Sequence, residues 1–218
     1  MLELRNLLYQ PATTERPVLE KISLQVGPGR PILISGASGS GKTSLIEVIS
    51  GLAAQQRGDV YWNGQVLNQR QRRWLCGVLF QFPERHFLGL SVSQELKLGQ
   101  RRLGTEQMHQ VLHRVGLTAV DLKQAPERLS GGQQRRLALA VQLLREPDVL
   151  LLDEPTAGLD WSVRDDVLQL LQALAKEKVL IVVTHEPDLF HRWNCEQWKL
   201  QGGQLRALSP LAAADASP

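Results

Sequence analysis

The stretch PILISGASGSGKT, residues 31–43, decides the fold of this chain. Its first five residues are almost entirely apolar, as is typical of a short strand buried on both faces of a parallel sheet. The next eight, Gly36–Thr43, match the pattern GxxxxGK[ST], and apolar residues follow at helical spacing from Leu45 to Ile49. A strand, a glycine-rich loop and a helix in this order predict a site for phosphate groups. The alternative, a flexible Gly-Ser turn without function, does not explain the flanking elements.

The residue types of this loop define its chemistry. Glycines let successive backbone N–H groups converge on phosphates, and a helix start adds a partial positive charge. Lys42 adds a full positive charge, and the hydroxyl of Thr43 suits a Mg²⁺ ion that bridges the phosphates. The predicted nucleotide contacts of the loop are Gly36, Ala37, Ser38, Gly39, Ser40, Gly41, Lys42, Thr43 and Ser44.

The elements around the loop follow an α/β pattern. Residues 2–9 and 18–26 alternate in polarity, which predicts an antiparallel pair of strands, and residues 58–66 predict a hairpin around Asn63-Gly64. Because strands then alternate with helices, we expect a mostly parallel, right-handed core. The remaining predicted core strands are 77–80, 149–152 and 179–183, and the predicted helices are 131–145 and 162–176.

A helical insertion interrupts this pattern. Residues 91–98, 105–115 and 118–122 carry apolar side chains at helical spacing, which predicts an inserted α-helical subdomain over about 84–130. A short helix after His185 and a hairpin around Gly202-Gly203 complete the expected elements. We expect one domain over 1–206 and a flexible tail over 207–218.

Asp153 and Glu154 follow the apolar run 149–152. We expect this strand to lie next to the strand of the phosphate loop, so that both carboxylates face the phosphates at the carboxyl edge of the sheet. Asp153 is then the predicted ligand of Mg²⁺, directly or through water. Glu154 is the predicted group that orients or deprotonates an attacking water. Without the phosphate loop, such a pair would indicate only a solvated turn.

Two further polar residues end predicted core strands. Gln81 follows the strand 77–80, where its side chain can reach the metal or the attacking water. His185 follows the strand 179–183, on the edge that faces the phosphates, and is a candidate contact of the γ-phosphate. The alternatives are an ordinary polar strand end for Gln81 and a structural histidine at 185.

A second glycine-rich segment, LSGGQ, occupies residues 129–133. Ser130 stands where it can cap a helix that begins at Gly131. The N–H groups of that helix start can face phosphates, but no lysine accompanies them. The segment therefore cannot hold a nucleotide alone, which predicts that a second copy completes the site.

In combination, these motifs resemble those of the ATP-binding cassette family over nearly the whole chain. The resemblance implies a P-loop NTPase core with an N-terminal antiparallel β layer, and two cassettes that face each other head to tail around ATP and Mg²⁺. It implies that Ser130, Gly131, Gly132 and Gln133 contact the γ-phosphate bound to Lys42 of the facing copy. It further implies Glu154 as catalytic base, Asp160 in communication between the sites, and Tyr9 stacked on adenine. The alternative for Tyr9 is a strand-edge aromatic without a ligand.

The resemblance also implies a biological role. Such ATPases hydrolyse ATP to power an integral membrane transporter subunit, and residues 80–87 and 98–104 are similar to those of energy-coupling-factor importers for vitamins, cobalt and nickel. We expect residues 81–98 to dock the membrane partner, with Phe82 and Phe87 as exposed aromatic contacts. The alternative is a soluble cassette ATPase that drives a protein machine, for example in iron–sulfur assembly. A GTPase is disfavoured because the Asn-Lys-x-Asp motif is absent.

The bulk composition agrees with this interpretation. The net charge of +3 is spread along the chain, so that no nucleic acid partner is expected. The two cysteines, Cys76 and Cys195, have neither disulfide nor metal-site spacing. No apolar run approaches the roughly 18 residues of a membrane span. We therefore expect a cytoplasmic protein, peripheral on the inner face of a membrane, that forms a homodimer or heterodimer with a second ATPase subunit.

Overall fold

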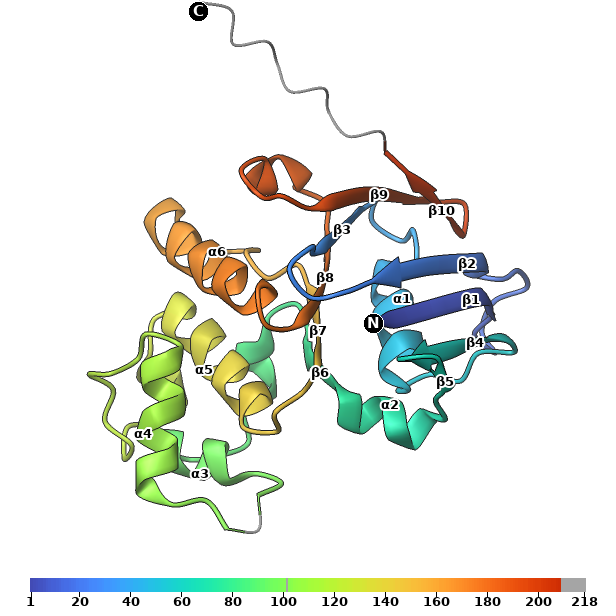
Figure 1. Cartoon of the computed structure of the whole chain (residues 1–218). Coiled ribbons are helices and arrows are strands. Elements are labelled where there is room, and N and C mark those ends of the chain that lie inside the picture. The colour runs from blue at the N-terminus through green and yellow to red at the C-terminus, as the bar shows by residue number, and fades with distance from the viewer. Residues whose placement is uncertain (101, 209–218) are drawn as a thin grey trace, which may run out of the picture.

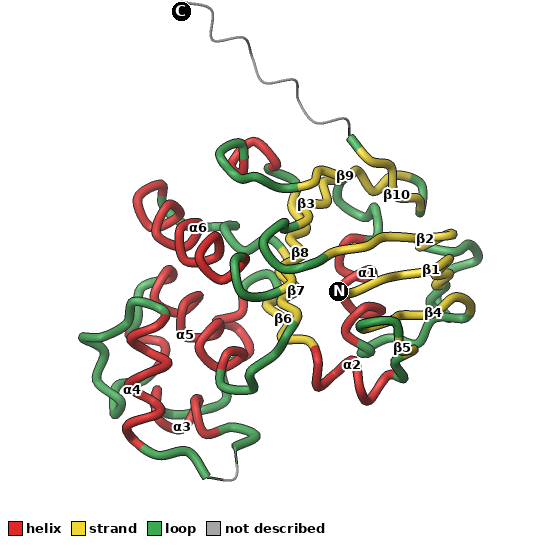
Figure 2. Tube along the Cα trace, viewed as in Figure 1, coloured by secondary structure: helices red, strands yellow, loops and turns green. Residues whose placement is uncertain are grey.

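The computed structural model describes residues 1–100 and 102–208, shown in Figures 1 and 2. Ten strands and six α-helices follow one another in this part of the chain. The strands are β1 (Leu2–Tyr9), β2 (Leu19–Val26), β3 (Ile32–Ser35), β4 (Arg57–Trp62), β5 (Gln65–Val66), β6 (Cys76–Leu79), β7 (Val149–Asp153), β8 (Val179–Thr184), β9 (Glu196–Gln201) and β10 (Gln204–Ala207). The helices are α1 (Lys42–Ser50), α2 (Gln69–Leu75), α3 (Val92–Lys97), α4 (Thr105–Arg114), α5 (Gly131–Leu143) and α6 (Trp161–Ala175).

A six-stranded sheet forms the centre of the molecule, in the order β10-β9-β3-β8-β7-β6. All its strands pair in parallel except β10, which is antiparallel to β9. The strands β2-β1-β4-β5 form a separate antiparallel sheet, and α1 lies between the two sheets (Figure 1). The helices α5 and α6 lie against the opposite face of the central sheet, and α3 and α4 pack on α5 (Figure 1). The predicted α/β core with an antiparallel β layer is confirmed.

Strand alternation divides the interior into two cores. On β7, Val149 and Leu151 pack toward α1 and the antiparallel sheet, whereas Leu150 and Leu152 pack toward α5 and α6. Every residue of β7 and β8 is buried. Because both faces of the sheet are covered at these strands, their sequences are continuous apolar runs.

The expected strand neighbour of the phosphate loop is wrong. β3 pairs with β8 and β9, and β8 separates it from β7, the strand that ends at Asp153. Because β7 and β8 have the same apolar character, the local sequence could not decide which of them lies beside β3. Because α1 crosses the sheet and packs against β7, the loop still reaches Asp153.

Three local expectations also differ from the structure. Residues 118–122 are turns rather than a helix, because the Asp121 side chain accepts the backbone N–H of Lys123 and because carbonyls at 122 and 124 accept the first N–H groups of α3. The helix α2 was not predicted. Ala207 ends β10, so the expected tail does not begin there, and residues 209–218 lie outside the described chain.

Across the described residues, every helix is too short or too polar to span a membrane.

Candidate functional site

A cavity of about 600 Å³ opens at the carboxyl ends of β3, β7 and β8. This volume lies within the range of small-molecule sites. Its lining includes residues of the phosphate loop together with all four polar residues predicted at strand ends. The lining residues are Val18, Ser38, Gly39, Gly41, Lys42, Thr43, Ser44, Gln81, Asp153, Glu154 and His185.

The loop before α1 has the shape of an anion cradle. Gly39 and Gly41 adopt left-handed φ angles of 76° and 98°, which glycine reaches without strain. A Cβ on Gly41 would lie 2.8 Å from a methyl group of Val18. The Lys42 ammonium donates hydrogen bonds to the backbone oxygens of Gly36 (2.7 Å) and Ala37 (3.1 Å), so it is held against the loop.

The loop also contains a buried polar group without a partner in the described chain. The buried hydroxyl of Ser40 has no hydrogen-bond partner among the described residues. A buried hydroxyl without a partner costs free energy, although Ser40 itself is not among the described residues that line the cavity. The glycine cradle and the fixed ammonium, which do line the cavity, fit the phosphates of a nucleotide.

Oxygen atoms suitable for a magnesium ion lie beside the cradle. The Thr43 hydroxyl donates to Oδ2 of Asp153 over 2.6 Å, and Gln81 lines the same cavity. Burial raises the pKa of Asp153; the Thr43 hydrogen bond and Lys42 oppose this rise, and the neighbouring Glu154 adds to it. Hydroxyl, carboxylate and amide oxygens are hard ligands of the kind Mg²⁺ prefers.

Glu154 is held in a fixed and unusual conformation. Its φ of 49° is left-handed, and its N–H donates to the Val183 oxygen over 2.9 Å. The Thr184 hydroxyl donates to Oε2 (2.9 Å), and Nδ1 of His185 lies 2.7 Å from Oε1. Strained backbone in a site persists where the surroundings over-determine it. The carboxylate therefore faces the cavity in one orientation, with His185 bound to it.

The second glycine-rich segment lies elsewhere. The Ser130 side chain accepts the N–H of Gln133, and the Gln133 side chain accepts the N–H of Ser130, so the two form a capping box at the start of α5. Ser130 and Gly131 are exposed, and residues 129–133 are not among the described residues that line the cavity. The predicted helix cap is confirmed. The structure does not bring the segment to Lys42 of the same chain.

Five other predicted contacts also lie outside the cavity lining: Gly36, Ala37 and Ser40 of the phosphate loop, Tyr9 and Asp160. The half-buried Tyr9 contributes its backbone oxygen, which accepts the N–H of Val18 over 2.8 Å. The exposed Asp160 precedes α6, and its side chain makes no capping hydrogen bond within the described chain. Thus Tyr9 lies beside Val18, which lines the cavity, whereas Asp160 lies at the surface near the start of α6.

Two residues that contact Glu154 were missed by the sequence analysis. Thr184 is fully buried. The sequence feature that could have identified it is its hydroxyl side chain directly after the apolar run 179–183. Arg135 is also buried, and its guanidinium donates to the backbone oxygens of Glu154 (3.0 Å) and Ala157 (2.9 Å). Its sequence context, the polar first half of a helix, gave no sign of burial.

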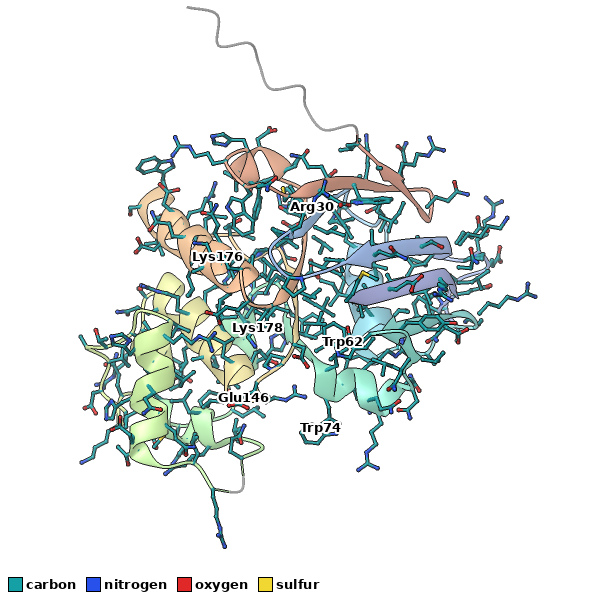
Figure 3. All side chains as sticks on the ribbon, in the orientation of Figure 1. Arg30, Trp62, Trp74, Glu146, Lys176 and Lys178 are labelled. Carbon is teal, nitrogen blue, oxygen red and sulfur yellow. The ribbon has the colours of Figure 1, made fainter. Side chains whose placement is uncertain are left out.

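The expected exposure of Phe82 and Phe87 is wrong. Both rings are half-buried: Phe82 lies under the Arg85 guanidinium, 4.8 Å from its ring centre, and Phe87 packs against the core around α5. The most exposed apolar side chains of residues 81–98 are instead Leu88 (80 %) and Leu90 (82 %), and Leu98 is also exposed. On the neighbouring α2, Trp74 also projects into solvent, as Figure 3 shows.

Comparison with known proteins places this geometry in a family. Residues 19–157 match the family model described as ABC transporter. The chain is 37% identical to the chloroplastic ABC transporter I family member 11 of Arabidopsis thaliana, across 96% of this chain and 81% of the relative. It is 35% identical to the energy-coupling factor transporter ATP-binding protein EcfA2 of Acetivibrio thermocellus, across 90% and 74% respectively.

A solved structure shows the same fold with bound nucleotide. It is a dimeric ATP-binding cassette in a post-hydrolysis state with ADP and Pi. The similarity covers 95% of this chain and 98% of that chain, with a TM-score of 0.79 and 26% identity. The chain therefore belongs to the ABC transporter family and is an ATPase that binds ATP.

Proposed function

We propose that this chain is the ATP-hydrolysing subunit of a membrane transporter, and that it dimerises with a second ABC ATPase subunit around MgATP. This proposal rests on one observation: the predicted phosphate contacts lie in two separate places on the same chain. Lys42 and the carboxylates line one cavity, whereas the start of α5 is exposed elsewhere on the same chain. A second subunit placed head to tail supplies the missing half to each cavity.

Each residue has a proposed role in this dimer. Thr43, Gln81 and Asp153 hold Mg²⁺, and residues 36–44 bind the phosphates. Glu154 is the general base for the attacking water, and His185 orients its carboxylate and contacts the γ-phosphate. Ser130–Gln133 cap the γ-phosphate of the facing subunit, Asp160 communicates between the sites, and Tyr9 stacks on the adenine. The 2.7 Å contact between His185 and Glu154 supports the pairing of those two roles.

The transporter type is proposed from similarity and from the surface. Likeness to an energy-coupling factor ATPase supports an importer of that type. We propose that residues 81–98 dock an integral membrane subunit, with Leu88 and Leu90 as the apolar contacts. The ATPase then sits on the cytoplasmic face of the membrane. Within it, residues 1–206 form one domain, and residues 84–130 form its helical subdomain.

The dimer is tested with the substitution Glu154→Gln. Removing the general base should leave ATP binding intact and abolish turnover, so that a MgATP-bound dimer accumulates on size-exclusion chromatography. The matched control is Glu106→Gln, an exposed change on α4, which should hydrolyse ATP as the wild type does. A Glu154→Gln protein that stays monomeric with saturating MgATP would contradict the proposal that two subunits together complete each ATP site.

The transport role is tested by copurification in detergent. We expect an integral membrane protein to be recovered with the wild-type chain, and recovery to fall when Leu88 and Leu90 are both changed to Glu. Recovery of a purely soluble complex would favour an ATPase that drives a soluble protein machine.

A further inference from the structure

Arg135 joins the start of α5 to the catalytic edge of the same chain. It lies two residues after Gln133 and is 2 % exposed. One guanidinium nitrogen donates to the Glu154 oxygen (3.0 Å), and another donates to the Ala157 oxygen (2.9 Å). Because a buried guanidinium is costly unless its donors are satisfied, these two contacts fix where the side chain lies.

The two carbonyls that Arg135 contacts belong to one tight turn. The N–H of Ala157 donates to the Glu154 oxygen over 3.1 Å, which closes the turn directly after the carboxylate residue. The other described contacts of Glu154 come from Val183, Thr184 and His185, at the end of β8. Arg135 therefore adds, from the helical side of the molecule, a contact to a residue otherwise held by the sheet.

The start of α5 is itself packed tightly on the segment that follows this turn. A Cβ on Gly132 would lie 1.9 Å from Val163 Cγ1, and one on Gly131 would lie 3.8 Å from Leu159. The helix start thus rests on the beginning of α6 and cannot shift without moving it. Through Arg135 and this packing, residues 130–133, the turn 154–157 and the start of α6 form one mechanical unit.

We infer that Arg135 is a positioning residue that ties Glu154, through its backbone oxygen, to the start of α5, and so couples the two ATP sites of a dimer. The inference rests on the proposed function, in which Ser130–Gln133 contact the nucleotide of the facing subunit. When that helix start engages the facing γ-phosphate, Arg135 holds Glu154 in the orientation that its own site requires. A displacement of the helix start by the facing nucleotide is then transmitted through Arg135 to the base of the same subunit.

The test is Arg135→Met, which keeps much of the side-chain length and removes both hydrogen bonds. A carboxylate misplaced by about 1 Å lowers turnover on the order of 100-fold. We expect a loss of this size in kcat with an unchanged KM for ATP, and accumulation of a MgATP-bound dimer without any substitution at Glu154. Arg135→Lys, which can still donate to one carbonyl, should recover part of kcat.

The matched control is Arg72→Met on α2. Arg72 is equally buried and also donates to a backbone oxygen, that of Val48. Neither Val48 nor the other hydrogen-bond partner of Arg72, Gln55, lines the cavity, whereas Arg135 contacts Glu154, which does. This control should lower the melting temperature and leave kcat unchanged. A wild-type kcat in Arg135→Met, or a low kcat without a MgATP-bound dimer, would overturn the inference. If Glu154→Gln alone also fails to dimerise, the proposed function itself has failed.

Discussion

At the scale of single residues, Asp153 carries a cost that the bound ligand removes. Burial raises the pKa of its carboxyl group, so in the nucleotide-free protein the charged form is disfavoured. The folded protein therefore favours the protonated form of Asp153. The stability that this form contributes is fully present below the pKa of Asp153 in the unfolded chain, and it is lost as pH rises through the pKa of Asp153 in the folded protein. At neutral pH, the protein therefore keeps a destabilised carboxylate where a divalent cation is needed.

This predicts that Asp153→Asn stabilises the nucleotide-free protein while abolishing its Mg²⁺-dependent hydrolysis. The amide oxygen can still accept the Thr43 hydroxyl, but it carries no charge to desolvate. We expect the melting temperature at pH 8 to rise by roughly 2–4 °C, with the difference from wild type vanishing toward pH 4. Differential scanning calorimetry across this pH range measures it.

The exposed change Asp166→Asn on α6 serves as the control, because it removes the same charge without relieving burial. A lower melting temperature for Asp153→Asn at pH 8 would show that its charged form stabilises the fold, contrary to the pKa argument.

At the scale of elements, the contact between α5 and α6 depends on one glycine. Gly132 faces Val163, whose β-branched side chain has little freedom to rotate away in a helix. Gly132→Ala should therefore destabilise the protein by about 1–3 kcal/mol, the usual cost of overpacking. Because residues 130–133 also move, ATPase activity should fall with stability.

Urea unfolding of a double-mutant cycle checks this contact. Val163→Ala should restore much of the stability lost in Gly132→Ala, because the two positions share the clash. Gly131→Ala, whose new Cβ would make only an ordinary 3.8 Å contact, should be close to wild type. Additive effects of Gly132→Ala and Val163→Ala would mean that the two helices separate rather than clash.

Elements with a strong local signal were predicted from the sequence. The apolar runs of β3, β7 and β8, the hairpin turn at Asn63-Gly64 and the cap of α5 were all confirmed. The helix α2 was missed, although Asn68 and Gln71 form a capping box at its start. Arg72 of this helix is buried, and its guanidinium donates to the carbonyl of Val48, a contact that local sequence does not indicate.

Features that depend on long-range packing were not predicted. The sequence indicated which residues end strands at the carboxyl edge, and the structure does bring Gln81, Asp153, Glu154 and His185 into one cavity. It did not indicate that β8 lies between β3 and β7. For the same reason it did not reveal Thr184 or Arg135, whose contacts with Glu154 join residues 19 or more positions apart in the chain.

At the scale of the whole molecule, the exposed start of α5 and the cavity with Lys42 predict complementation between inactive chains. Lys42→Ala removes the phosphate-binding charge from its own cavity, and Ser130→Arg blocks the helix start offered to the facing subunit. Either protein alone should lack turnover, because every site of its dimer contains the defect.

A mixture of the two variants should regain a measurable part of wild-type turnover. Each mixed dimer contains one intact site, with Lys42 from the Ser130→Arg chain and Ser130 from the Lys42→Ala chain. The control is a chain with both substitutions mixed with Lys42→Ala, since that pairing leaves no intact site and should stay inactive. Steady-state ATPase assays at equal total protein compare the mixtures. If the first mixture also stays inactive although both chains bind each other, the facing helix start does not complete the ATP site, and residues 130–133 act only as a helix cap.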